Sequence, residues 1–261
     1  MRQLVTMLMA AAALALVAAE AQAAEKRKLK IGTEGAYPPF NAIDENGELI
    51  GFDIDIANAL CDAANFACEF VIQDWDGIIP GLLAKKYDAI IASMAITEKR
   101  KEIVDFTNRY FNSPARFVAA KGADANVSYE GLAGKTVGVQ RATTHEDFLR
   151  SKFASVDVRV YATQDEANAD LVSGRLDFVM ANAVALLEGF LKTDAGEGFE
   201  YVGPDYYDPQ YHGEGAGIAI RKGEDDLRET LNAAIEQIRA DGTYQAINAK
   251  YFDFDVYGPD P

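Results

Sequence analysis

Hydrophobic residues recur along the chain with two alternating periods. Lys28–Thr33 alternates polar and apolar residues as a strand does, whereas the apolar residues of Phe52–Ala64 recur at helical spacing. A strand over Cys68–Ile72, a helix over Ile78–Lys85 and a strand over Asp88–Ile91 continue the series. This order of strands and helices predicts a mostly parallel sheet with crossover helices.

A second series of the same kind follows. We expect strands at 117–120, 136–139, 156–160, 177–180 and 217–220, and helices from 144, at 166–173, 183–192, 225–240 and 243–251. Phe111–Pro114 and Gly203–Gly217 separate the two series. The sequence therefore predicts an α/β protein of two lobes, the first built from residues 24–112 and 208–261 and the second from 113–207. Ligands of such sheets lie beyond the carboxyl ends of the strands, here between the lobes.

The first residues have the composition of an export signal. Arg2 is followed by the apolar run Leu4–Ala19 and by the small-x-small site Ala21–Ala23. This pattern predicts a signal peptide over residues 1–23 and a mature chain that begins at Ala24. The apolar run is short and ends at Glu20, which argues against a membrane anchor, and no later run is long enough to span a bilayer.

Net charge, cysteines and the absence of known motifs limit the classes of ligand and cofactor that we expect. The formal charge of −16 argues against nucleic acid and anionic lipid as partners, and it leaves room for cationic ligands. In an exported protein Cys61 and Cys68 are expected to form a disulfide, with two buried thiols as the alternative. His145 and His212 have no metal-ligand spacing, and no nucleotide-binding or catalytic-serine motif is present, so we expect neither metal nor cofactor.

The segment Tyr87–Thr107 contains the clearest indication of a binding site. An apolar strand runs into a turn of small residues, and a helix with Arg100 in its first turn is expected from Thr97. The turn consists of Ala92, Ser93, Met94 and Ala95. Free backbone N–H groups and a guanidinium near one point suit a carboxylate, which arginine binds with two parallel hydrogen bonds. A solvated charge on the helix is the alternative for Arg100.

Other segments would complete the same site. Glu34 follows the first strand and Asp53 opens the first helix, so both would suit a positive group, although Asp53 would also favour the helix N-terminus by itself. Thr143 or Thr144 would cap the helix after the strand at 136–139, which would direct its first N–H groups at the same carboxylate. Charges of both signs suggest a zwitterion with a cationic tail, such as an amino acid.

Two aromatic residues, Tyr37 and Trp75, follow predicted strands. They would sandwich the aliphatic stem of a ligand or lie over a cation, and packing in the core is the alternative for each. Their placement would add an apolar wall to a site that is otherwise polar.

Eight stretches spread over the mature chain suggest a family. They are IGTEGAYPPF, GELIGFDIDIANALC, WDGIIPGLLAKKYDAIIASMAITEKR, GKTVGVQ, SGRLDFV, LLEGFLK, DGTYQAINAKYFDF and DVYG. In order and spacing they resemble the periplasmic substrate-binding proteins of polar amino-acid ABC transporters, in particular binders of lysine/arginine/ornithine, histidine, octopine and nopaline. The resemblance implies a type II periplasmic binding fold that closes on its ligand. It also implies a monomer in the periplasm that serves a membrane permease, and a disulfide between Cys61 and Cys68.

The resemblance also implies roles for individual residues. Arg100 and Thr144 would take the α-carboxylate, Tyr37 and Trp75 would stack on the side chain, Glu34 with Asp53 would meet the distal cation, and Ser93 and Gln140 would line the pocket. The chain departs from the basic amino-acid binders at Ala92 and Ala95, where those proteins have serine, and at Asn182, where they have an aspartate for the α-ammonium group. The opine binders look similar there, so both a cationic amino acid and a guanidino opine stay open as ligands.

The leading prediction is a binding protein and not an enzyme. A periplasmic dehydratase similar to cyclohexadienyl dehydratases is the alternative of another class, and it would use a carboxylate of the cleft as its acid. The sequence shows no obvious acid–base set for that reaction.

Overall fold

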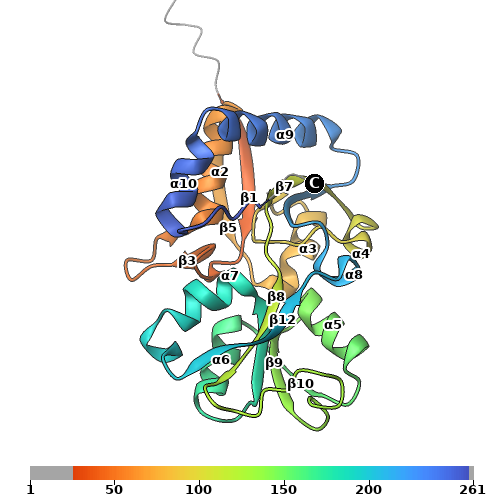
Figure 1. Cartoon of the computed structure of the whole chain (residues 1–261). Helices are drawn as coiled ribbons and strands as arrows, with labels where there is room; N and C mark the ends of the chain where they lie inside the picture. The colour runs from red at the N-terminus through yellow and green to blue at the C-terminus, as the bar shows by residue number, and fades with distance from the viewer. Residues whose placement is uncertain (1–25, 259–261) are drawn as a thin grey trace, which may run out of the picture.

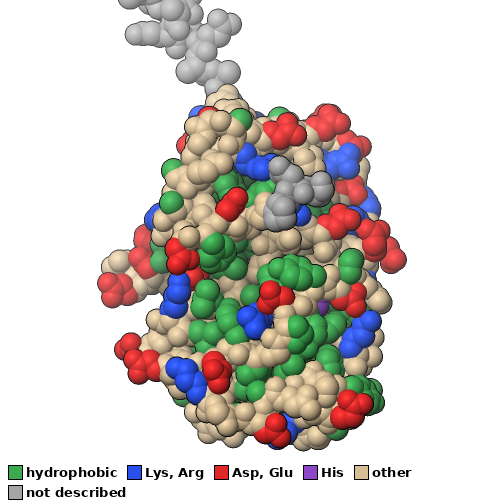
Figure 2. All heavy atoms as spheres, in the orientation of Figure 1, with side chains coloured by type: hydrophobic (Ala, Val, Ile, Leu, Met, Phe, Trp, Pro, Cys, Tyr) green, Lys and Arg blue, Asp and Glu red, His purple; other side chains and the backbone are tan. Residues whose placement is uncertain are grey.

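A computed structural model describes residues 26–258 and shows two lobes, one above the other (Figure 1). Each lobe contains a five-stranded sheet flanked by helices, which confirms the predicted fold class. The expected export signal lies outside the described residues. Within residues 26–258 no helix is both long and apolar enough to cross a membrane. Acidic side chains lie on both lobes of the face shown in Figure 2.

The sheet of the first lobe has the order β5-β1-β6-β13-β7. Its strands are β1 (Arg27–Thr33), β5 (Phe66–Ile72), β6 (Ala89–Ile90), β7 (Val104–Phe111) and β13 (Ala216–Arg221). Strand β1 pairs in parallel with β5 and β6, whereas β13 runs antiparallel to β6 and β7. A small antiparallel sheet follows β1 and consists of β2 (Ala36–Tyr37), β3 (Asn41–Ile43) and β4 (Leu49–Ile50).

Helices cover the sheet of the first lobe. They are α2 (Phe52–Ala63), α3 (Trp75–Leu83), α4 (Glu98–Lys101), α9 (Asp225–Ala240) and α10 (Thr243–Tyr251). The core beneath α2, α9 and α10 contains a cluster of aromatic rings, in which Phe40 stacks on Phe111 with centroids 4.5 Å apart. The disulfide between Cys61 and Cys68 is present and joins the end of α2 to β5, as predicted.

The sheet of the second lobe has the order β10-β9-β11-β8-β12. Its strands are β8 (Ala115–Ala120), β9 (Thr136–Gln140), β10 (Asp157–Tyr161), β11 (Phe178–Asn182) and β12 (Phe199–Tyr206). Its helices are α5 (Thr144–Lys152), α6 (Gln164–Val172), α7 (Ala183–Leu186) with a π-helical continuation over Leu187–Leu191, a 3-10 turn at Asp194–Gly196, and α8 (Pro209–His212). The chain passes between the lobes twice, from β7 to β8 and from β12 to β13.

Two long strands and one short helix were not predicted. The sequence reads Gly203 and Pro204 as the start of a loop, yet β12 continues to Tyr206 with a register shift after Val202. A proline fits there because β12 is at the edge of its sheet. Strand β7, which lies between α4 and the point where the chain passes to the second lobe, was also not predicted.

Helix α8 packs on the second lobe, although the sequence assigned residues from 208 onward to the first. Tyr211 lies in the core of the second lobe, 5.5 Å from Phe148 between ring centroids. Lys152 and Asp208 form a salt bridge of 3.1 Å. These contacts attach the segment to α5, so the part of the chain that returns to the first lobe begins after α8.

Candidate functional site

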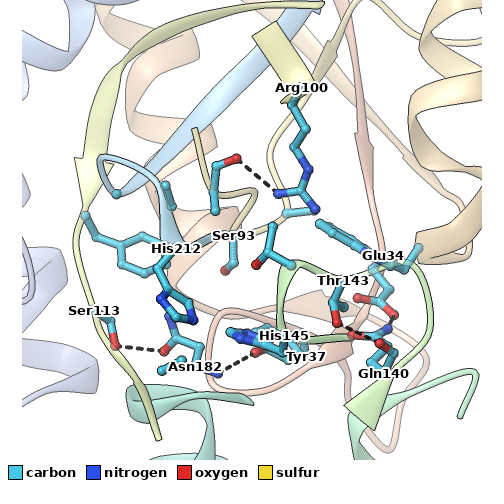
Figure 3. Close-up of a pocket in the computed structure, with 18 residues that line it drawn as sticks. Glu34, Tyr37, Ser93, Arg100, Ser113, Gln140, Thr143, His145, Asn182 and His212 are labelled. Atoms are coloured by element: carbon cyan, nitrogen blue, oxygen red, sulfur yellow. Dashed lines mark hydrogen bonds between the residues drawn. The ribbon is translucent and has the colours of Figure 1, made fainter. Parts of the chain in front are cut away.

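A cavity between the lobes contains most of the residues singled out in the sequence (Figure 3). The predicted residues that line it are Glu34, Tyr37, Trp75, Ala92, Ser93, Ala95, Arg100, Gln140, Thr143, Thr144 and Asn182. Most follow the carboxyl end of a strand or open the next helix, which is where parallel sheets present ligand sites. The structure thus places groups from both lobes around one space.

Arg100 enters the cavity from α4. Thr97 caps this short helix, and its hydroxyl accepts a hydrogen bond from the backbone N–H of Arg100 at 3.3 Å. The guanidinium donates to the carbonyl of Ala95 at 3.0 Å and lies over the ring of Trp75, 5.2 Å from its centroid. Asp147 pairs instead with Lys99 at 2.7 Å.

This guanidinium is therefore partly buried and has no counter-ion among the described residues. Burial lowers the pKa of Arg100 to about 10, an effect that the charge of Asp147 partly opposes. Among residues 26–258 it forms no salt bridge. A buried charge without a partner is unfavourable, so the site favours an anionic group beside Arg100.

Glu34 supplies the opposite charge. Its side chain is 7% exposed and accepts a hydrogen bond from Nε2 of Gln140 in the other lobe. Burial raises the pKa of Glu34 to about 7, and the Gln140 hydrogen bond only partly offsets this effect. Within the described chain Glu34 has no basic partner, so this end of the cavity favours a cation.

Thr143 and Thr144 have different roles at the start of α5. Thr143 is the N-cap of α5, because its hydroxyl accepts from the backbone N–H of Glu146 at 3.3 Å and donates to the carbonyl of Gln140 at 2.7 Å. Thr144 is the first residue of the helix and also lines the cavity. The capping role thus belongs to Thr143 and leaves the Thr144 hydroxyl for other contacts.

Both aromatic residues line the cavity and also bridge the lobes. The hydroxyl of Tyr37 accepts a hydrogen bond from the backbone N–H of Asn182 at 3.3 Å, and burial raises the pKa of this phenol. The indole Nε1 of Trp75 donates to the carbonyl of Ala142 at 3.1 Å. Two exposed salt bridges also cross the cleft, Arg141–Asp76 at 2.7 Å and Lys99–Asp147 at 2.7 Å. The lobes are therefore in contact, as in a closed binding protein.

Asp53 does not line the cavity, contrary to the sequence-based expectation. It is fully buried, and its carboxylate accepts hydrogen bonds from Asn41 at 2.8 Å, Ser93 at 2.9 Å and Tyr110 at 2.8 Å. Burial raises the pKa of Asp53 to about 6, and these hydrogen bonds oppose that effect. These contacts connect its carboxylate to the turn at Ser93 and not to the cavity.

Met94 is the second residue that turns away from the cavity. Ser93 adopts a left-handed backbone conformation with φ of 53°, and the next side chain is fully buried in a cluster with Ile78 and Leu82. Met94 therefore belongs to the core of the first lobe.

The sequence did not assign several residues that complete the lining. They are Phe111, Ser113, Ala115, His145, His212, Gly215 and Ala216. His145 follows Thr144 directly, so its position next to a predicted site residue was a usable signal. His212 had no such signal, because α8 was not predicted and His145, whose ring lies next to it, is 67 residues earlier in the chain. The two histidine rings lie 5.9 Å apart between centroids.

A two-lobed α/β fold with a cavity between its lobes, lined by buried charges of both signs, defines a solute-binding protein. The chain belongs to the bacterial extracellular solute-binding proteins, family 3, whose family model matches residues 29–254. The resemblance found in the sequence is thereby confirmed.

Individual relatives are similar over nearly their whole length. The chain is 50% identical over 253 residues to the L-arginine-binding protein of Pseudomonas aeruginosa, covering 96% of this chain and 97% of that protein. It is 43% identical over 243 residues to the histidine-binding periplasmic protein of Escherichia coli, covering 92% and 94%. The structure of an ancestral arginine-binding protein bound to arginine matches with a TM-score of 0.80 at 42% identity, covering 87% of this chain and 100% of that one.

Proposed function

We propose that this protein is the periplasmic receptor of an ABC transporter, which captures a cationic amino acid of the arginine/lysine/ornithine type and delivers it to a membrane permease. The observation that carries the proposal is the pair of uncompensated groups in one cavity, a partly buried guanidinium at Arg100 and a buried carboxyl at Glu34. A dipolar ligand with a cationic tail supplies a partner to each. The relatives named above are binders of amino acids, which favours this ligand class over a guanidino opine and binding over dehydration.

In this proposal the ligand extends between the two charged groups. Arg100 and Thr144 take the α-carboxylate from opposite lobes, and Glu34, oriented by Gln140, takes the cationic tail. Tyr37 and Trp75 cover the aliphatic stem. A micromolar dissociation constant corresponds to about −8 kcal/mol, which paired charges and stacking on this scale supply.

The same charges connect binding to closure of the lobes. Closing buries Arg100 and Glu34, which is unfavourable while each lacks a partner. A ligand that pairs both groups removes this penalty in the closed form only, so it shifts the population toward closure. The closed pair of lobes is then the surface that a permease distinguishes from the unliganded protein.

A ligand panel tests the proposal. Purified protein is mixed with arginine, lysine, ornithine, histidine, glutamine and octopine, and its melting temperature is followed before calorimetry on the best ligand. Arginine, lysine or ornithine should raise the melting temperature by mass action, whereas glutamine, which lacks the cationic tail, should do so weakly. The proposal fails if no cationic amino acid stabilises the protein, or if the pure protein turns over arogenate or prephenate.

A further inference from the structure

The cavity has a second polar end that the proposed contacts leave unused. His145 and His212 lie there beside Asn182, below Arg100 in Figure 3. His212 is 9% exposed. Nδ1 of His145 and both ring nitrogens of His212 are buried and have no hydrogen-bond partner among the described residues. Buried polar atoms normally have partners, so three unpartnered ring nitrogens at one cavity indicate a ligand group.

Asn182 is not available as an acceptor at this end. Its Oδ1 already accepts hydrogen bonds from the backbone N–H groups of Val184 at 2.9 Å and Ala185 at 3.3 Å, and from the hydroxyl of Ser113 at 3.0 Å. The remaining polar group of this side chain is its NH₂, which donates. Asn182 therefore serves as the cap of α7 and offers an ammonium group no acceptor.

An amino-acid ligand brings an ammonium group to this place. If its carboxylate lies on Arg100 and Thr144, the α-ammonium group is one carbon away and requires acceptors nearby. Among the described residues that line the cavity, Glu34 is the single acid, and the proposed function uses it for the other end of the ligand. His145 follows Thr144 in the chain and lines the same cavity as Arg100.

Both imidazoles are in the form that accepts hydrogen bonds. Burial lowers the pKa of His145 to about 3, with further contributions from His212 and Arg100. Burial also lowers the pKa of His212 to about 4, opposed by the charge of Asp208. A neutral imidazole has one bare nitrogen that accepts and one N–H that donates. Each ring therefore offers one acceptor at neutral pH.

We propose that His145 and His212 accept hydrogen bonds from the α-ammonium group of the bound amino acid, in place of an acidic side chain. This inference rests on the proposed function and specifies how the same site recognises an α-amino group. Neutral acceptors bind the ammonium group without adding a second buried negative charge to the cavity that already contains Glu34.

The test combines changes in the protein with a change in the ligand. Affinities for L-arginine and for 5-guanidinopentanoate, which is arginine without its α-amino group, are measured by calorimetry for the wild type, His145→Leu and His212→Leu. We expect each leucine variant to bind arginine roughly 10- to 100-fold more weakly, the usual loss for a hydrogen bond to a charged group, and to bind 5-guanidinopentanoate about as the wild type does. His145→Gln and His212→Gln retain an acceptor and should recover much of the arginine affinity.

A purely structural role gives a different result, since His212 also packs on Phe148 with ring centroids 5.0 Å apart. Equal losses for both ligands would overturn the inference while the proposed function stood. A wild type that binds no cationic amino acid would overturn both. For variants that do not fold, nitrogen NMR of the wild-type histidine rings decides: arginine should shift the bare ring nitrogens of both residues, and 5-guanidinopentanoate should not. Identical spectra with the two ligands would contradict the proposal.

Discussion

Arg100 carries the least compensated charge of the described cavity, and this determines what its removal does. The substitution Arg100→Met retains an unbranched side chain and removes the charge. We expect arginine binding to weaken at least about 100-fold, because the ligand carboxylate loses a charged, two-pronged donor. The free energy of unfolding of the unliganded protein should be unchanged or about 1 kcal/mol higher, because an unpaired buried charge is gone. Calorimetry and urea unfolding measure the two effects.

A variant that loses affinity only because it unfolds would contradict this reading of Arg100. Arg159→Met is a matched control, since Arg159 lies on β10, pairs with Asp157 at 2.6 Å and is not among the residues that line the described cavity. It should leave arginine affinity unchanged.

Glu34 makes binding dependent on pH. With the lobes closed, burial raises the pKa of Glu34 from its ordinary 4.5 to about 7, so the group is largely neutral below neutral pH until a cation pairs with it. A ligand guanidinium pairs with the ionised form, and binding therefore releases a proton. We expect arginine affinity to fall as pH drops from 8 to 5.5, approaching tenfold per unit below pH 7.

Calorimetry at several pH values checks this dependence, with neutral citrulline and the variant Glu34→Gln as controls. Both should flatten the profile. The same raised pKa has the opposite effect on the closed form before it binds a ligand, whose stability should fall as pH rises from 4.5 through 7, because this form resists ionisation of Glu34. An arginine affinity that is constant from pH 8 to 5.5 would exclude Glu34 as the partner of the cation.

At the scale of single residues, the sequence predicts those site residues whose structural neighbours are close in the sequence. Arg100 could be predicted as a site residue because a strand, a turn and a helix follow one another within one short segment around it. The place of Asp53 depends on Ser93 and Tyr110, which are 40 and 57 residues away, and no local pattern contains those partners. The position of Asp53 at the start of a helix suggested an acid that faces a ligand. Instead, hydrogen bonds from the hydroxyls of Ser93 and Tyr110 hold its carboxylate in the core.

Among the elements, α3 and the turn after β9 connect the lobes through exposed side chains. The Arg141–Asp76 salt bridge is about half exposed at both partners, so it is worth less than about 1 kcal/mol. We expect Arg141→Gln to release arginine up to about fivefold faster with little change in the rate of association. Trp75 is the single tryptophan of the sequence and bridges the cleft, so stopped-flow fluorescence reports the release directly.

Added salt should reproduce the effect of Arg141→Gln in the wild type and have a smaller effect in the variant, because exposed charges are screened. A release rate that is the same in both proteins would show that this salt bridge does not stabilise the closed form.

The disulfide supports the lobe and not the site. Cys61 and Cys68 are near the amino end of β5, whereas the cavity lies beyond the carboxyl ends of the strands. We expect the double variant Cys61→Ser, Cys68→Ser to lose roughly 2–3 kcal/mol of unfolding free energy, the chain-entropy value for a short loop. Its arginine affinity should match that of the wild type at a temperature where both are folded. A large loss of affinity would mean that the bridge positions the cleft.

The prediction of elements succeeded where the hydrophobic period and the charges at the helix ends agree. Helix α9 begins and ends as expected, since its buried positions recur at helical spacing, two acidic residues lie in its first turn and Arg239 lies in its last turn. Strand β12 was missed because Gly203 and Pro204 interrupt its pattern, and only its edge position in the sheet makes them acceptable.

For the whole molecule, the sequence predicts two lobes because each strand–helix series is a local pattern. It cannot predict how the lobes meet. Gln140 and Glu34 are 106 residues apart, and Trp75 and Ala142 are 67 apart, so these contacts exist only once both lobes are folded and closed. The same reason explains the misplaced boundary at α8, whose attachment to the second lobe depends on tertiary contacts of Tyr211.

The central claim is that the two uncompensated groups of the cavity take opposite ends of one dipolar guest. A crystal structure of the protein grown with L-arginine tests it most directly. We expect the ligand carboxylate on the Arg100 guanidinium and the ligand guanidinium on the Glu34 carboxylate. An arginine bound in the reverse direction, or an uncharged ligand in the cavity with Arg100 turned to solvent, would contradict it.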